Sequence, residues 1–245
     1  MRFTKIPVET FESIQLNAGI IVDSFNTTTG EIGRIIGATT GGISFQATPS
    51  FTDFAEDIDN AAKNMMEFKR LDQWEAKMSG TFATISADLA KALTAAADKT
   101  GSEYIKTQDT APKPGRVYYT RSGEDPNYVY TPVTNPTAES MSDYYVRTKT
   151  PVKITPRADL ALADFSDKWW IGDYSSYNGD TKGGFCAIRL INSLSTGGFQ
   201  IQSGDKAKGQ FGFEFTGHYS NANPSIVPFE IYIKIGDAES TDSST

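Results

Sequence analysis

Cysteine and histidine are nearly missing from this chain of 245 residues, which has one of each, Cys186 and His218. A single cysteine excludes an intramolecular disulfide, and with it the disulfide-built scaffold of many small secreted domains. Structural zinc sites usually take four cysteine or histidine ligands, so one of each also argues against such a site. Cys186 lies in the apolar run FCAIRLIN and is expected to be a small buried hydrophobic residue.

Long apolar runs are missing as well. No stretch of 18 apolar residues occurs, so the sequence predicts no membrane-spanning helix. The N-terminal segment MRFTKIPVETFESIQLNAG has no apolar core of the signal-peptide type. We therefore expect a soluble protein that is made in the cytoplasm and has no membrane partner.

Basic residues are in deficit, because 23 Lys and Arg stand against 30 Asp and Glu, a formal charge of −7. Proteins that hold nucleic acid are usually basic, since neutralising phosphates drives the binding. The sign of the charge is wrong for a protein that wraps DNA. It suits a surface past which DNA must move without sticking.

Sequence motifs of catalysis are absent. The chain contains no G-x-S-x-G, H-E-x-x-H or C-x-x-C, and GATTGG at 37–42 lacks the Lys-Ser/Thr of a phosphate-binding loop. The acids Asp53, Glu56, Asp57 and Asp59 lack the order of an EF-hand, and predict a solvated loop, with a subunit contact or the lining of a channel as alternatives. No enzymatic activity, catalytic residue, cofactor or metal is predicted.

The chain is rich instead in alternation of period two, which is typical of half-buried strands. In QWEAKMSGTFATIS, for example, Trp74, Met78 and Phe82 share one face. Strands are predicted at 13–23, 43–48, 73–86, 152–155, 185–192, 199–203, 209–217 and 227–235. Loops are predicted at 24–42 and 163–184, and 50–72 is either a long loop or contains a short helix at 58–69. Strands in runs predict a mainly β chain, as a β-sandwich or barrel-like fold.

One helix is predicted, at 86–98. Ser86 can cap its first turn through the hydroxyl group, and Leu89, Leu93 and Ala96 fall on one narrow apolar stripe. Gly101 suits its C-terminal stop. A narrow stripe predicts a helix that lies on a sheet with its other side in water, on the outer side of the domain.

Composition changes abruptly after this helix. The stretch from Gly101 to Thr150 has no Phe, but it holds seven of the 11 Tyr and five of the 11 Pro. We interpret 102–148 as a small β-rich module, a short meander with its own aromatic cluster, inserted in a loop of the main domain. Its tyrosines either form that core or stack on sugars or bases, and the small size of the module favours the core.

Near the C-terminus, GQFGFEFTGHYS places Phe211, Phe213 and Phe215 on one predicted strand face. Glu214 and His218 fall on the opposite face, toward a lumen, a neighbouring subunit or water. A catalytic histidine needs a nucleophile or a carboxylate partner, so a hydrogen-bonded structural role is favoured for His218.

The run at 19–86, which begins GIIVDSFNTTTGEIGRIIGATTGGISFQATPSF, resembles the major tail protein, or tail tube protein, of long non-contractile-tailed bacteriophages. A second run at 211–233, FGFEFTGHYSNANPSIVPFEIYI, is similar to the same family. The resemblance covers about 1–100 and 150–245. It divides the chain into a tail-tube domain at 1–101 and 149–235, the inserted module at 102–148 and an acidic tail at 236–245.

The resemblance implies a tail-tube β fold with one outer helix, six subunits closing each ring, and strands joining into a continuous inner barrel. Rings would stack into the tube of the virion tail, assembled in the host cytoplasm, and DNA would pass through the lumen without specific binding. The partners implied are the chain itself and the tail-tip or baseplate, tape-measure and tail-terminator proteins. The family offers no active site.

The loops at 24–42 and 50–72 are candidate contacts between rings or subunits, because they carry aromatic and aliphatic residues that one monomer would bury poorly. The predicted interface residues are Phe25, Ile35, Ile36, Phe51, Asp53, Phe54, Glu56 and Asp57.

Another reading is a carbohydrate-binding β-sandwich or adhesin that uses the Tyr-rich module or the segment WWIGDYSSY. Tyr128 and Trp170 are the residues to test for it. A β-fold hydrolase has no supporting motif.

Overall fold

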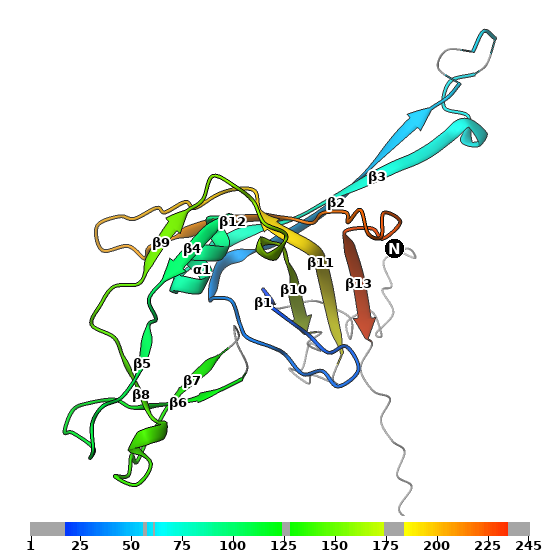
Figure 1. Ribbon diagram of the computed structural model, residues 1–245. Helices are drawn as coiled ribbons and strands as arrows, with labels where there is room; N and C mark the ends of the chain where they lie inside the picture. Colours follow the sequence, from blue (N-terminus) through cyan, green and yellow to red (C-terminus); the bar gives the residue numbers. More distant parts are fainter. Residues whose placement is uncertain (1–17, 56–57, 61, 124–127, 174–183, 235–245) are drawn as a thin grey trace, which may run out of the picture. The chain divides into compact units, whose positions relative to one another are not determined.

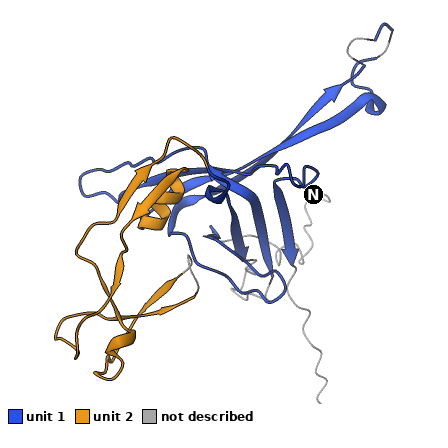
Figure 2. Cartoon of the chain, in the orientation of Figure 1, with its two compact units in different colours: residues 1–85, 161–245 blue, residues 86–160 orange. Residues whose placement is uncertain are grey.

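The computed structural model describes residues 18–55, 58–60, 62–123, 128–173 and 184–234 (Figure 1). Of the described residues, 46% lie in strands and there is one α-helix, so the fold is mainly β, which confirms the predicted fold class. It divides into two compact units (Figure 2). The first comprises 1–85 and 161–245, and the second comprises 86–160.

In the described part of the first unit there are seven antiparallel strands, of which six follow one path in the order β1-β10-β11-β12-β3-β2. Their bounds are Ile20–Val22 for β1, Ser166–Asp173 for β10, Phe185–Ser195 for β11, Phe211–Thr216 for β12, Lys69–Phe82 for β3 and Thr39–Asp53 for β2. The seventh, β13 (Phe229–Lys234), pairs with β11. Strand β11 thus joins a group containing β1, β10 and β13 to a group containing β12, β3 and β2.

The core of this unit follows the alternation read from the sequence. Met78 and Phe82 of β3 and Phe215 of β12 are fully buried, and Phe213 of β12 is buried. The rings of Phe82 and Phe213 lie 4.5 Å apart. Because each such side chain contributes about 1.5–3 kcal/mol when it is buried, these facing rows hold β3 and β12 together.

The predictions for the segments 163–184 and 50–72 are wrong in part, because both segments contain regular secondary structure. The segment 163–184, predicted to be irregular, contains the 3-10 helix Leu162–Asp164 at its start and then the eight-residue strand β10. Strand β10 is buried on both faces, so its sequence has no clean alternation. The segment 50–72 likewise contains the end of β2, the 3-10 helix Met66–Phe68 and the start of β3. The short strand predicted at 199–203 is absent, because Gln202 forms only an isolated bridge with Gln210 there.

The second unit begins with α1 (Ala87–Leu93), which is shorter than the predicted helix at 86–98. The Ser86 hydroxyl accepts a hydrogen bond from the Leu89 amide at 3.1 Å, as predicted for the cap. The helix ends early because Ala95 takes a left-handed φ of 65° and the chain enters β4 (Ala97–Thr100). Leu89 and Leu93 are buried, as the stripe predicts.

Strand β4 pairs with β9 (Lys153–Pro156), with Thr100 opposite Lys153. The predicted strand at 152–155 therefore belongs to the second unit, and does not resume the main domain. Between β4 and β9 lies a separate four-stranded sheet in the order β5-β8-β6-β7. Its strands are β5 (Tyr104–Lys106), β6 (Tyr119–Ser122), β7 (Val129–Pro132) and β8 (Tyr145–Arg147).

This sheet is not the meander predicted for 102–148, because β8 returns to lie between β5 and β6. The predicted aromatic cluster is present. It consists of Tyr118, Tyr144, Val146 and Met141, which begins the 3-10 helix Met141–Asp143. Tyr118 is fully buried, and its hydroxyl donates to Asp109 at 2.8 Å.

Candidate interaction surfaces

The longest feature of the first unit is the hairpin of β2 and β3, which runs beyond its neighbour β12 (Figure 1). Strand β12 pairs with β3 only from Lys77 to Phe82. In the described ladders, residues 69–75 of β3 pair only with β2. The distal part of this hairpin is therefore a two-stranded arm. An isolated two-stranded ribbon is marginally stable in water, so such an arm needs further packing to be held in place.

The arm exposes large apolar side chains. Phe51 and Phe54 are 52% and 50% exposed, and Met66 is 82% exposed. Others at least one-third exposed are Ile58, Phe68 and Leu71. Phe51 and Leu71 are cross-strand partners, so their side chains form one apolar pair on the same face. Clustered exposed apolar side chains on a soluble domain usually mark a contact surface.

Two cations accompany these rings. The Lys69 ammonium lies 5.6 Å from the Phe51 ring centroid, and the Arg70 guanidinium lies 5.2 Å from that of Phe54. Arg70 also pairs with Asp72 at 2.9 Å, and Thr52 donates to Asp72 at 2.6 Å. The hydrogen bonds from Thr52 and Arg70 lower the pKa of the Asp72 carboxyl group.

Asp53 has a structural part in the arm. Its carboxylate accepts hydrogen bonds from the amides of Ala55 and Asn64 at 3.0 Å each, which ties the two sides of the tip together. The predicted contact residues Phe51 and Phe54 lie beside it. Glu56 and Asp57, also predicted, lie outside the described residues.

The three predicted contact residues of the loop at 24–42 differ in how far they are exposed. Phe25 is half-buried and packs edge-on against Trp169 at 5.7 Å and Phe185 at 5.1 Å. It therefore belongs to the unit's own core cluster. Ile35 is 50% exposed, and Ile36 is half-buried. Only Ile35 stands out from the unit as a contact residue would.

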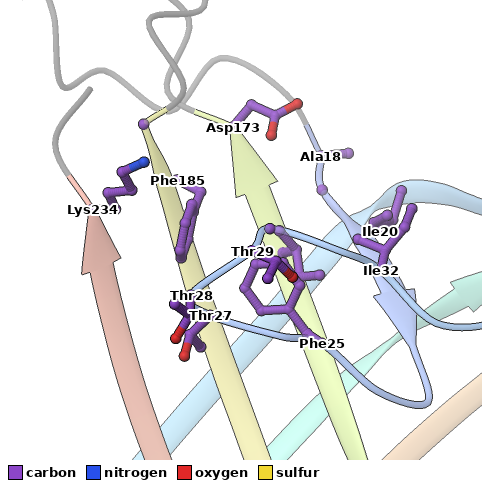
Figure 3. A pocket seen from close by; sticks show the side chains of 14 residues that line it. Ala18, Ile20, Phe25, Thr27, Thr28, Thr29, Ile32, Asp173, Phe185 and Lys234 are labelled. Carbon is purple, nitrogen blue, oxygen red and sulfur yellow. The ribbon is translucent and has the colours of Figure 1, made fainter. Parts of the chain in front are cut away.

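Phe25 also lines a pocket of about 660 Å³ (Figure 3). Phe185, Ile20 and Ile32 supply the other apolar walls, and Thr27, Thr28 and Thr29 add hydroxyl groups. The remaining side walls include Asp173 and Lys234, next to segments outside the described residues. The described lining has no histidine or cysteine and no paired carboxylates, so we assign it no chemistry.

Two strand edges of the first unit are open among the described residues. No strand pairs with the outer edge of β2, which is 15 residues long and contains Pro49, a residue confined to edge strands because it cannot donate a ladder hydrogen bond. Strand β13 pairs only with β11, and it exposes Ile231 and Ile233. Open edges of this length are templates for pairing with another chain.

The second face of β2, β3 and β12 is polar. One register row contains Ser44, Ser79 and Glu214, and the next contains Gln46, Lys77 and Thr216. Glu214 accepts a hydrogen bond from the Thr196 hydroxyl at 3.0 Å. Lys77 pairs with Glu75 at 2.7 Å, and this hydrogen bond, with a smaller contribution from Glu214, raises the pKa of Lys77.

His218 does not join Glu214 on this face. The chain leaves the β12 ladder at Gly217, and the His218 amide donates to the Ile191 carbonyl at 3.1 Å. Its Nδ1 contacts the Asn192 carbonyl oxygen at 3.1 Å, and its ring meets Phe165 edge-on at 5.2 Å. These contacts give His218 a structural role at the end of the strand.

Several residues of the arm were not identified from the sequence, namely Met66, Phe68, Lys69, Arg70 and Leu71. No single period in the sequence identifies them, because Met66 and Phe68 belong to the 3-10 helix before β3 and the register shifts where Ser50 opposes Gln73 and Phe51 opposes Leu71.

Among the described residues, no helix is both long and apolar enough to cross a membrane. Comparison with models of protein families and with curated protein sequences found no match to this chain.

Proposed function

We propose that this chain is a structural subunit that assembles with copies of itself into stacked rings, as the tail tube of a long non-contractile-tailed bacteriophage. The observation that carries the proposal is β2, a 15-residue strand whose outer edge pairs with no other described strand and which continues into an arm with exposed apolar side chains. A monomer has no use for either feature, and both are hazards for aggregation unless a defined partner covers them.

Two different open edges favour a ring. If β2 of one copy pairs with a different strand edge of the next copy, the contact is head-to-tail, and repeated head-to-tail contacts close into a cyclic assembly when the rotation permits. The β13 edge is one available partner. The apolar arm then supplies a second contact, from one ring to the next.

The polar sheet face suits a lumen through which DNA passes. Its rows present hydroxyl and amide groups, such as Ser44, Gln46 and Ser79, and the one basic residue in these two rows, Lys77, is paired with Glu75. Phosphate groups are held mainly by Lys and Arg, so a face with little basic charge lets DNA slide. Glu214 adds a repulsive charge. On this proposal the subunit works in the virion tail, with tail-tip, tape-measure and terminator proteins as partners, and performs no catalysis.

Electron microscopy of the purified chain tests the proposal. Negative-stain images at increasing protein concentration should show rings or tubes of uniform diameter, and analytical ultracentrifugation should show a discrete large species. A chain that stays monomeric at high concentration, and forms no tubes when tail-tip complexes are added to nucleate them, would refute the proposal.

A further inference from the structure

The four-stranded sheet of the second unit has two unlike faces. One face carries Val146, which belongs to the buried cluster with Tyr118 and Tyr144. The register places the alternate residues on the other face. That second face, which we call the Tyr–Arg face, comprises Tyr104, Lys106, Tyr119, Arg121, Tyr130, Tyr145 and Arg147, together with Tyr128 beyond the start of β7.

The rings on the Tyr–Arg face are packed on one another. Tyr104 and Tyr130 are stacked with centroids 4.1 Å apart and planes 8° from parallel. Tyr119 meets Tyr104 edge-on at 5.0 Å, and Tyr145 meets Tyr130 edge-on at 5.4 Å. Tyr119 is almost fully buried, whereas Tyr104, Tyr130 and Tyr145 are half-buried.

Each arginine of this face lies against two rings. The Arg121 guanidinium is 4.1 Å from the Tyr128 centroid and 5.0 Å from that of Tyr145. Arg147 is 6.0 Å from the Tyr104 centroid and 5.7 Å from that of Tyr119. Such packing fixes a guanidinium and restricts its rotamers, so a ligand finds the group already oriented.

The charge of the face has one sign. The four strands contain three basic residues, Lys106, Arg121 and Arg147, and no acidic residue. All three lie on the Tyr–Arg face. The nearby Glu103 is engaged elsewhere, because its carboxylate accepts the Ala87 amide hydrogen bond at 2.8 Å at the start of α1.

We propose that the Tyr–Arg face binds an acidic glycan, a polysaccharide that carries carboxylates. The fixed guanidinium forks of Arg121 and Arg147 match planar carboxylates bidentately. The tyrosine hydroxyls supply donors and acceptors for sugar hydroxyl groups. This site goes beyond the proposed tube subunit, because it lies in one unit and needs no assembly.

Single-stranded nucleic acid is the less favoured ligand. Proteins hold it by stacking bases on free aromatic faces. Here the ring faces are taken up by Arg121, by Arg147 and by the stacked pair Tyr104 and Tyr130. The chain as a whole is also acidic, at −7.

Titration calorimetry of the full chain with polygalacturonate, neutral dextran and a single-stranded oligonucleotide tests this inference. We expect binding to polygalacturonate only, weakened about tenfold by Arg121→Gln and about 100-fold by the double variant with Arg147→Gln, since each charge-assisted bond is worth about one decade. The control is the double variant Lys91→Gln and Lys153→Gln, which removes two exposed charges of the same unit on α1 and β9, outside the four-stranded sheet, and should bind like the parent chain.

Tyr130→Phe guards against a folding artefact, because it keeps the ring and removes only the hydroxyl group. It should weaken binding several-fold with an unchanged melting temperature. Three outcomes would overturn the inference: no binding of polygalacturonate at millimolar concentration, equal losses in the arginine and lysine variants, or an oligonucleotide or dextran bound as tightly as polygalacturonate. Because the assay needs no rings, a failure to assemble leaves its outcome unaffected, and its own failure says nothing against the tube.

Discussion

Lys168 carries a charge into the interior of the first unit. The residue is 7% exposed, and its ammonium group donates to the Ser166 hydroxyl and to the Asp167 carbonyl at 3.3 Å. Burial lowers the pKa of Lys168 to about 8. The nearby carboxylates of Asp23 and Asp167 act in the opposite direction and raise this pKa, but their effect is smaller. Removing a charge from water costs free energy that this partial set of partners offsets incompletely.

The pH dependence of the stability follows from the pKa of Lys168 in the folded chain and its pKa in the unfolded chain. In the unfolded chain the lysine keeps its ordinary pKa of 10.5. Between about 8 and 10.5 the unfolded chain therefore binds more protons at this residue than the folded chain does. The contribution of Lys168 to stability rises with pH through this window, by about 1.4 kcal/mol per pH unit at most, and is constant below and above it.

Lys168→Met should remove this rise. The variant keeps a similar length without the charge, so we expect it to be more stable than the parent chain at pH 7, with the difference shrinking as pH rises to 10.5. Urea unfolding at several pH values measures it. Lys149→Met, at an exposed position, is the control and should keep the parent's pH profile. A stability difference that stays constant from pH 7 to 10.5 would contradict the lowered pKa.

At the level of elements, substitutions in the β2–β3 arm can distinguish an effect on assembly from an effect on the stability of the monomer. Phe51 and Phe54 are half exposed, so replacing both with Ser should lower the free energy of unfolding by about 2 kcal/mol, half of what two fully buried side chains contribute. If the arm contacts another copy, the same change removes two apolar rings from that contact and places serine hydroxyl groups in it. The change should therefore abolish rings or tubes. Melting temperature and electron microscopy give the two readouts.

The matched control for the arm is Ser50→Ala with Gln73→Ala, a cross-strand pair of exposed polar residues on the same hairpin. It should assemble like the parent chain. Tubes of normal length from the Phe51 and Phe54 variant would show that the exposed rings are not an assembly contact.

Elements with one buried face were predictable from the sequence, and those without one were not. Phe211, Phe213 and Phe215 alternate with polar residues, and β12 was predicted at its place. The strand β10 was missed because Lys168, Trp169 and Trp170 give no period when both faces are covered. The arm was missed because residues around Phe51 and Leu71 are exposed on either face, so burial imposes no pattern on them.

Some predicted contact residues are exposed in the structure, and others are covered by the chain itself. The sequence predicts Phe51 and Phe54 as contacts because they are apolar residues in a polar loop, and they are exposed. The same reasoning predicts Phe25 as a contact, but Phe25 packs on Trp169 and Phe185, which are distant in sequence. Sequence alone ranks a residue as apolar. Only the fold decides whether a partner within the chain covers it.

For the whole molecule, the register of β4 and β9 explains how the chain carries a second sheet. Thr100 lies opposite Lys153, so the two ends of the segment between them are adjacent. A segment with adjacent ends can be exchanged for a short turn at little cost in chain entropy. The two strands then form an ordinary hairpin beside α1.

Replacing residues 104–148 with a short Gly-Ser turn should therefore leave rings and tubes intact and abolish glycan binding. This deletion keeps Glu103, whose carboxylate accepts the first amide hydrogen bond of α1. The longer deletion of 102–148 removes Glu103 and should lower the stability of this unit by a further ~1 kcal/mol, the usual value of a lost cap. Thermal unfolding, electron microscopy and calorimetry on the two deletions separate these effects. If neither deletion assembles, the inserted sheet is part of the scaffold, and the ring contacts extend beyond the first unit.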